Sequence, residues 1–243
     1  MVGRQIKGIM KTKNEEPPKL LKLYTHGRWI YLFLALVALL IIFPFVKESG
    51  IRQAHYILYF LNLVVVLAII YEVSYNLFQF LLALLIAVPI LVIGWLPETP
   101  ALDFAHTVLN TLLYAYAIFM ILSVLMPLET VDIEAIYGTI SLYILIGLCW
   151  ANVYKVIDYF NPGAFVFSNQ TVDRAFDWVD YLYYSFVTLT TLGYGDIVPV
   201  APQARSSAIL ESISGVIFIA VMVSKTIGLY VSEIRSRKAA RKG

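Results

Sequence analysis

The chain has 243 residues, of which 60% are hydrophobic and 14% are charged, and its mean hydropathy is +0.78. This composition excludes a soluble globular domain and predicts an integral membrane protein. The formal net charge of +2 arises from basic residues near the two ends, because residues 53–154 contain no lysine or arginine. Such clusters favour contact with anionic lipid, so we expect a membrane-lipid partner and no nucleic-acid partner.

Six apolar stretches are each close to the length of about 20 residues that a helix needs to cross a bilayer. Short polar or turn-forming segments separate them, such as KESG at residues 47–50 and PETP at residues 97–100. The even number allows both basic ends to be cytoplasmic. We therefore expect a multi-pass, all-α protein of the plasma membrane or of the bacterial inner membrane. The predicted spans are residues 29–46, 55–72, 75–96, 104–126, 136–157 and 206–230.

The connection between the fifth and sixth stretches is predicted to lie on the outer side and to contain a re-entrant half-helix. Residues 178–190 are aromatic and apolar but too few to cross a bilayer, and Asp177 and Asp180 supply capping residues at their start. Irregular backbone at this depth is tolerated only where protein or a water-filled cavity surrounds it. The following residues, TLTTLGYGD at 188–196, should therefore line an aqueous path.

These residues have the features that a ring of backbone carbonyls requires, and such rings can replace the hydration shell of K⁺. Consecutive carbonyls point the same way only if alternate residues adopt left-handed conformations, which Gly193 and Gly195 permit. Thr191 can add its hydroxyl as the innermost ligand. The side chains of Leu192 and Tyr194 then face away from the axis, and we expect Tyr194 to pack on the aromatic residues Trp178, Tyr183 and Tyr184.

At residues 188–196 the chain resembles the tetrameric potassium channel family, whose usual signature is T-x-x-T-V-G-Y-G-D. The one departure is Leu192, where valine is more usual. The resemblance implies a homotetramer, because one chain supplies one filter segment and a closed ring needs four. It implies a selectivity filter at Thr191–Gly195 that holds K⁺ on the carbonyls of residues 191–194, with support from Thr188 and Asp196. K⁺ is the permeant ligand, and we expect no other cofactor.

Further positions follow from the same resemblance. Gly215 lies twenty residues beyond Gly195, as does the family's hinge glycine, and it serves either as a hinge or as a site of close packing on the pore helix. Tyr183 lies where some members have a tryptophan bonded to the last residue of the signature, which implies a hydrogen bond to Asp196. Val187 replaces a buried glutamate found in some members. The residues expected to line the cavity and its inner mouth, or else to face lipid, are Val216, Ile219 and Val223.

Two ionisable residues lie inside the sixth stretch, where a charge costs at least about 2.5 kcal/mol. Glu211 precedes Gly215 by one helical turn, so we expect it to contact the pore helix or to bridge to a neighbouring subunit. Lys225 is expected to extend to the membrane interface, or else to face the pore as a gate element.

The first four stretches resemble the sensor domain of voltage-gated members, whose fourth helix carries an arginine at every third position. The fourth stretch here has none, so we expect weak or absent voltage dependence. We therefore divide the chain into a basic cytoplasmic tail (1–28), a sensor-like domain (29–127), a pore domain (128–232) and a short basic cytoplasmic tail (233–243). Glu72, Asp103 and His106 lie near predicted span ends and are expected to be solvated, with a proton-sensing His106 as the alternative.

The sequence does not favour an enzyme, because it contains neither H-E-x-x-H nor G-x-S-x-G and its three histidines are well separated. The favoured function is a potassium-selective channel subunit. Two alternatives stay open, a poorly selective cation channel and a silent regulatory subunit of another channel.

Overall fold

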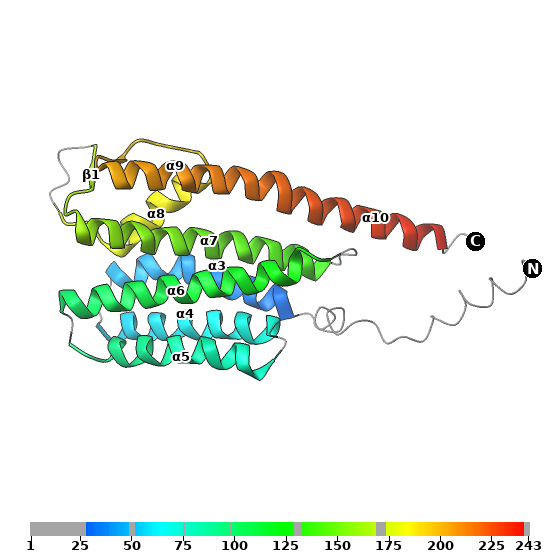
Figure 1. Ribbon diagram of the computed structural model, residues 1–243, viewed down its shortest axis with the longest axis horizontal. Coiled ribbons are helices and arrows are strands. Elements are labelled where there is room, and N and C mark those ends of the chain that lie inside the picture. Colours follow the sequence, from blue (N-terminus) through cyan, green and yellow to red (C-terminus); the bar gives the residue numbers. More distant parts are fainter. Residues whose placement is uncertain are drawn as a thin grey trace, which may run out of the picture.

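The computed structural model describes residues 28–48, 52–74, 76–97, 99–128, 133–168 and 174–240. The predicted tail at residues 1–28 therefore lies outside the described residues, apart from Arg28. Five long helices come first: α3 (Arg28–Glu48), α4 (Arg52–Val73), α5 (Leu77–Gly94), α6 (Pro100–Leu125) and α7 (Ile133–Phe160). They run roughly along the long axis of the molecule (Figure 1).

After α7 the chain forms two short strands that pair with each other, and a short helix lies between them in the sequence. Strand β1 (Phe165–Phe167) pairs antiparallel with β2 (Ile197–Pro199), and α8 (Trp178–Leu189) lies between them in the sequence. A continuous helical stretch follows, consisting of α9 (Pro202–Ile217), a π-helical segment η3 (Phe218–Val223) and α10 (Ser224–Ala240). A short helix is thus present where the sequence predicted the re-entrant helix, and neither the two-stranded ribbon nor the π-helical segment was predicted.

Four stretches of the described residues are long and apolar enough to cross a membrane. They are Leu77–Gly94, Pro100–Leu125, Ile133–Phe160 and Pro202–Ser232. Shorter apolar stretches, Trp29–Ile42 and Phe60–Val73, lie within α3 and α4. The helical, multi-pass membrane fold is confirmed, whereas the number of six crossings stays a prediction.

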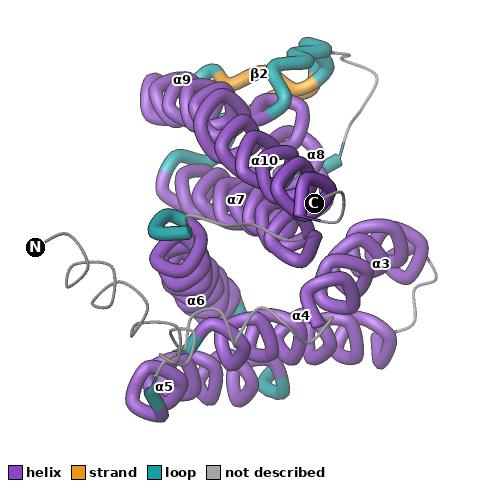
Figure 2. Tube along the Cα trace, turned by 90° about the vertical axis from the view of Figure 1, so that its right-hand side faces the viewer, coloured by secondary structure: helices purple, strands orange, loops and turns teal. Residues whose placement is uncertain are grey.

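The helices form two groups that meet at α7. Helices α3, α4, α5 and α6 make up the first group, in which α5 packs on α4 and α6 (Figure 2). Helices α8 and α9 pack on each other and on α7, and η3 and α10 also contact α7. Because α3 and α6 contact the other side of α7, this helix joins the two groups.

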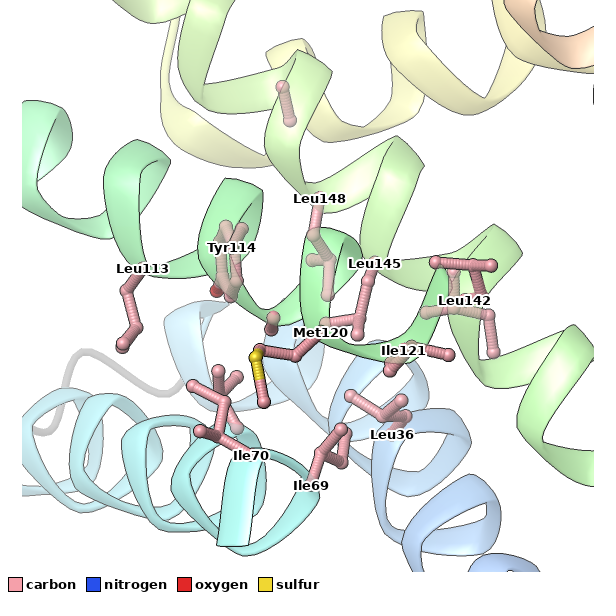
Figure 3. Packing of buried hydrophobic residues seen from close by; sticks show 14 of the residues in the cluster. Leu36, Ile69, Ile70, Leu113, Tyr114, Met120, Ile121, Leu142, Leu145 and Leu148 are labelled. Atoms are coloured by element: carbon pink, nitrogen blue, oxygen red, sulfur yellow. The ribbon is translucent and has the colours of Figure 1, made fainter. Parts of the chain in front are cut away.

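An apolar core fixes the first group on α7. Buried residues of α6 recur at helical spacing, including Leu113, Ala117, Met120 and Ile121, and they face Leu36, Ile69, Ile70 and Leu145 from three other helices (Figure 3). In lipid, such packing holds helices together mainly by van der Waals contact and not by exclusion of water. The position of α7 therefore depends on shape complementarity with α3 and α6.

Candidate functional site

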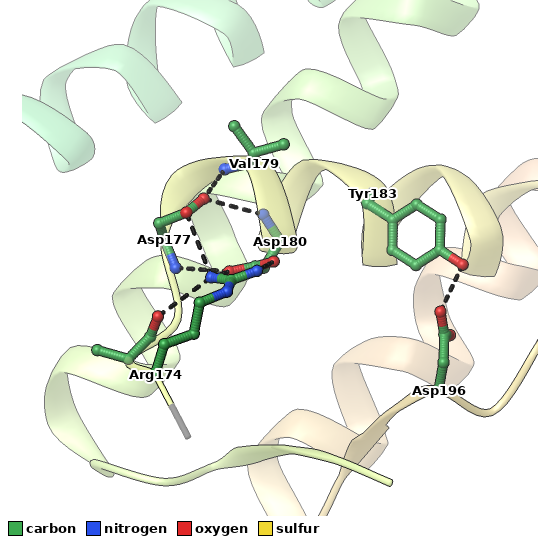
Figure 4. Close-up of polar contacts among 7 residues, drawn as sticks. Arg174, Asp177, Val179, Asp180, Tyr183 and Asp196 are labelled. Atoms are coloured by element: carbon green, nitrogen blue, oxygen red, sulfur yellow. Dashed lines mark hydrogen bonds and ion pairs between the residues drawn. The ribbon is translucent and has the colours of Figure 1, made fainter. Parts of the chain in front are cut away.

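The short helix α8 begins in a charged cluster. The Asp177 carboxylate accepts hydrogen bonds from the backbone N–H groups of Val179 (2.7 Å) and Asp180 (3.3 Å), while the Asp180 carboxylate accepts the N–H of Asp177 (2.9 Å) (Figure 4). Arg174 binds both carboxylate oxygens of Asp180 at 2.6 Å. The hydrogen bond to Asp180 raises the pKa of Arg174 above its ordinary value. This cluster satisfies the first N–H groups of α8 and fixes where the helix starts.

The loop that follows α8 has an alternating backbone. Thr191, Gly193 and Gly195 have positive φ angles of 60°, 56° and 78°, and they are separated by residues without positive φ. A single left-handed residue reverses the direction of the next peptide, so strict alternation turns successive carbonyls toward the same side. Left-handed conformations were predicted for the two glycines but not for Thr191.

The N–H groups of this loop point back to the end of α8. The N–H of Leu192 (2.9 Å) and that of Gly193 (3.3 Å) both bond to the carbonyl of Val187, and the N–H of Thr191 bonds to the carbonyl of Thr188 (2.9 Å). Among the described residues, the carbonyls of residues 191–194 accept no hydrogen bond. The loop therefore presents unpaired acceptors on its other side.

The outer end of the loop is tied to neighbouring elements. The Tyr183 hydroxyl donates a hydrogen bond to the Asp196 carboxylate at 2.6 Å, as expected (Figure 4). The backbone N–H of Ser168 bonds to the Asp196 carbonyl at 2.8 Å, and the Ser168 hydroxyl bonds to the Gly195 carbonyl. The Gly195 carbonyl is thus engaged by the loop after β1, so the run of free carbonyls ends at residue 194.

The expected packing of Tyr194 on the aromatic residues of α8 is not present in the single chain. Its side chain is 66% exposed, and that of Leu192 is 58% exposed. Trp178 instead donates a hydrogen bond to Asn152 of α7 (2.9 Å). Tyr184 packs edge-on against Tyr154 and Phe165. Two large side chains of the loop are therefore left without cover within one chain.

The helix α9 approaches the end of α8 very closely at Gly215. A Cβ atom at this position would lie 2.1 Å from the carbonyl oxygen of Leu189, which no real contact permits. The same carbonyl accepts a hydrogen bond from the Tyr143 hydroxyl of α7 (3.2 Å). Of the two roles expected for Gly215, close packing on the pore helix is therefore present, and the hinge role stays a prediction.

Glu211 contacts the pore helix as expected. Its side chain is buried between α7, α8 and α9, next to the hydroxyl groups of Tyr154 and Ser185. Both hydroxyls belong to the same chain, so the contact needs no neighbouring subunit. Sequence reasoning did not identify Tyr154 or Ser185, because a lone tyrosine or serine in an apolar stretch carries no signal of its own.

The residues expected to line the inner cavity differ in exposure. Val216 and Ile219 are 54% and 51% exposed, whereas Val223 is partly buried against the core. The ammonium group of Lys225 bonds to the carbonyl of Met126 at the end of α6, and its extension to the membrane interface or toward the pore stays a prediction. This lysine therefore satisfies one of the carbonyls that a helix end leaves without a partner.

Asp103 is exposed, as expected for a solvated group, and it also forms an ion pair with Lys155 of α7, at 2.6 Å. Both residues line a cavity of about 50 Å³ between α3, α4, α6, α7 and α8, together with His106 and Asn110. The nitrogens of the His106 ring lie 3.2 and 3.3 Å from the side-chain amide of Asn110. The proton-sensing role of His106 stays a prediction.

Comparison with known proteins places this site in a family. Residues 142–232, from the middle of α7 into α10, match a family model described as "Ion channel". Protein LctB of Bacillus caldotenax is 30% identical over 98 residues, which cover 40% of this chain and 72% of LctB. No solved structure matches the chain. The chain belongs to the ion channel family, and its matched region contains α8, the loop at 190–196 and α9.

Proposed function

We propose that the chain is one subunit of a homotetrameric, potassium-selective channel. In this proposal four copies of the loop at residues 191–194 surround a common axis, and their carbonyls replace the water around K⁺. The ion is conducted passively, and the protein needs no other cofactor.

The observation that carries the proposal is the alternation of backbone handedness at Thr191, Gly193 and Gly195. It directs the N–H groups to α8 and leaves four successive carbonyls without hydrogen-bond partners. In the proposed tetramer these carbonyls would line a narrow axis away from bulk water, where unpaired acceptors are costly unless a ligand satisfies them. A dehydrated monovalent cation satisfies several carbonyls at once.

The tetramer is supported by two features that are incomplete in one chain, the carbonyl ring and the cover of exposed apolar side chains. A single loop supplies carbonyls on one side of an axis only, and its side chains at Leu192 and Tyr194 are exposed. Apolar side chains are also exposed along α9 and η3, among them Ile209, Ile213, Val216 and Ile219. Three further copies would close the carbonyl ring and cover these surfaces.

The orientation of α8 adds an electrostatic contribution. The carboxylates of Asp177 and Asp180 lie at its first turn, and the loop begins where its last turn ends. The carboxyl end of a helix carries a partial negative charge. Four such ends directed at one axis would favour a cation over an anion at the inner end of the filter.

The direct test is ion flux through purified protein in liposomes, with K⁺ and Na⁺ compared. The wild-type protein is expected to conduct K⁺ in strong preference to Na⁺. Gly193→Ala should lower the K⁺ flux or the selectivity at least about tenfold, because a side chain at a left-handed position costs about 1–2 kcal/mol in each of four subunits.

Gly163→Ala is the matched control. Gly163 also has a positive φ, 82°, and open space around its Cβ position, but it lies in the turn after α7 and outside the loop. It should retain flux and selectivity. Equal K⁺ and Na⁺ flux in the wild type would indicate the poorly selective channel instead, and absence of flux would indicate the silent subunit.

A further inference from the structure

A buried carboxyl group lies behind the candidate filter with no cation beside it. The Glu211 side chain is 0% exposed. Its Oε1 atom lies 2.6 Å from Ser185 Oγ of α8, and its Oε2 atom accepts the hydroxyl proton of Tyr154 of α7. In the described part of the chain, no ion pair involves Glu211.

The hydrogen bonds around Ser185 require one more proton than an ionised carboxylate allows. Ser185 Oγ lies 2.6 Å from Glu211 Oε1 and also 2.8 Å from the carbonyl oxygen of Gly147. A hydroxyl group has one proton to donate, and a carbonyl oxygen has none. If Glu211 were ionised, one of these two short contacts would join two acceptors.

A proton on Glu211 Oε1 removes this conflict. Glu211 then donates to Ser185, Ser185 donates to the Gly147 carbonyl, and Tyr154 donates to Glu211 Oε2. In this arrangement each of these hydrogen bonds joins one donor to one acceptor. Gly147 lies on α7, Ser185 on α8 and Glu211 on α9, so a single chain of hydrogen bonds joins the three helices.

The surroundings of Glu211 also disfavour a charge. The titratable groups that face it are Tyr143, Cys149 and Tyr154 on α7 and Tyr184 on α8. All of them are uncharged at neutral pH in their ordinary state, and no lysine or arginine among the described residues compensates a carboxylate there. An ionised carboxylate that is buried without a cation is among the most costly groups in a protein interior.

We propose that Glu211 is held in its protonated form and is a positioning residue that fastens the pore helix to the helices on either side. Ser185 precedes Thr191 by less than two helical turns, so this bond fixes the helix that places the candidate filter. The effect on conduction rests on the proposed function, whereas the protonation itself does not.

Infrared spectroscopy of the protein in lipid tests the protonation directly. The difference spectrum between the wild type and Glu211→Gln should contain the C=O stretch of a carboxylic acid, and this band should stay constant from mildly acidic to mildly alkaline pH. Asp103→Asn is the control, because Asp103 is paired with Lys155 and its loss should remove a carboxylate band only. A difference spectrum without an acid band at Glu211 would overturn the proposal.

Ion flux tests the positioning role. Glutamine can donate to Ser185 through its NH₂ group and accept from Tyr154 through its oxygen, so Glu211→Gln should assemble and conduct like the wild type. Glu211→Ala leaves both hydroxyls without this partner and should lower flux about tenfold or more. A glutamine variant that fails to fold, or that conducts as poorly as the alanine variant, would contradict the role. If the wild type itself carries no flux, the proposed function fails, and the infrared band still decides the protonation of Glu211.

Discussion

The two groups of helices use their buried polar residues differently. In the first group, buried Thr107 and Asn110 bond to carbonyls of their own helix, at 2.8 and 2.9 Å. From α7 to α10, buried polar side chains join different helices, as in Asn152 to Trp178 and Ser185 to Glu211 near the candidate filter and Thr139 to Thr226 further along the helices. Several directional bonds thus fix the relative positions of α7 to α10, whereas α3 to α6 depend mainly on apolar packing, supplemented by the bonds of Asn62 to Tyr114 and of Tyr116 to the Gln79 carbonyl. The family match covers the part that is fixed in this way.

The largest effect that would follow from this difference is expected at Gly215. In Gly215→Ala the new Cβ would overlap the Leu189 carbonyl, so α9 must move away from α8. We expect loss of flux and a decrease in stability of about 1–3 kcal/mol, measured by thermal denaturation in detergent and by liposome flux.

Gly94→Ala, in the first group, is the matched control. Apart from its own stretch of helix, no atom lies within 4 Å of its Cβ position, so the stability of the protein should change by less than about 1 kcal/mol. A normal melting temperature for Gly215→Ala combined with lost flux would instead favour the hinge role of this glycine.

A smaller effect is expected at Tyr183. Tyr183→Phe removes the hydrogen bond to Asp196, which contributes about 1 kcal/mol, and should shorten the conducting periods in single-channel recordings. The change should leave the melting temperature nearly constant, because the bond lies at the exposed outer end of the loop. In Tyr159→Phe, a control at the outer end of α7, the ring still stacks on Phe104 and the recordings should match the wild type. Identical recordings for the two variants would show that the bond to Asp196 does not support the filter.

The smallest expected effect is that of membrane voltage on conductance. No lysine or arginine lies in α6, and Lys155 on α7 is the one lysine or arginine between Arg52 and Arg174. The free energy of a unit charge changes by about 2.3 kcal/mol per 100 mV when it crosses the whole field, so a fourth helix without such charges should respond very little to voltage. Conductance measured in voltage steps should therefore change little. A steep rise that persists in Lys155→Ala would require a charge movement elsewhere in the protein.

Much of this arrangement could be predicted from local sequence. The predicted stretch at residues 104–126 corresponds to Pro100–Leu125, and the predicted half-helix at 178–190 corresponds to Trp178–Leu189. Length, apolar composition and capping residues determine such elements, and all three can be read from neighbouring positions. The positive φ at Gly193 and Gly195 could also be predicted, because glycine is the residue that adopts it without strain.

Other features could not be predicted from the types of the neighbouring residues. The left-handed Thr191 is held by its bond to Thr188 and has no signal in residue type, since β-branched residues avoid this conformation. The ion pair of Asp103 depends on Lys155, which lies 52 positions further along the chain. The packing of Tyr194 could not be predicted from one chain for a different reason. In the proposed tetramer, the surface that would cover this side chain belongs to another copy.

The π-helical segment η3 changes the angular phase of the last helix. Each residue of an α-helix advances the side-chain direction by about 100°, and a π-helical turn holds one residue more than an α-helical turn. A helical wheel drawn from Gly215 therefore assigns the wrong directions beyond Val223. With this offset, Lys225 reaches Met126 and Thr226 reaches Thr139. Deletion of one residue within η3 would turn both side chains away by about a quarter of a revolution and leave everything before Phe218 in register.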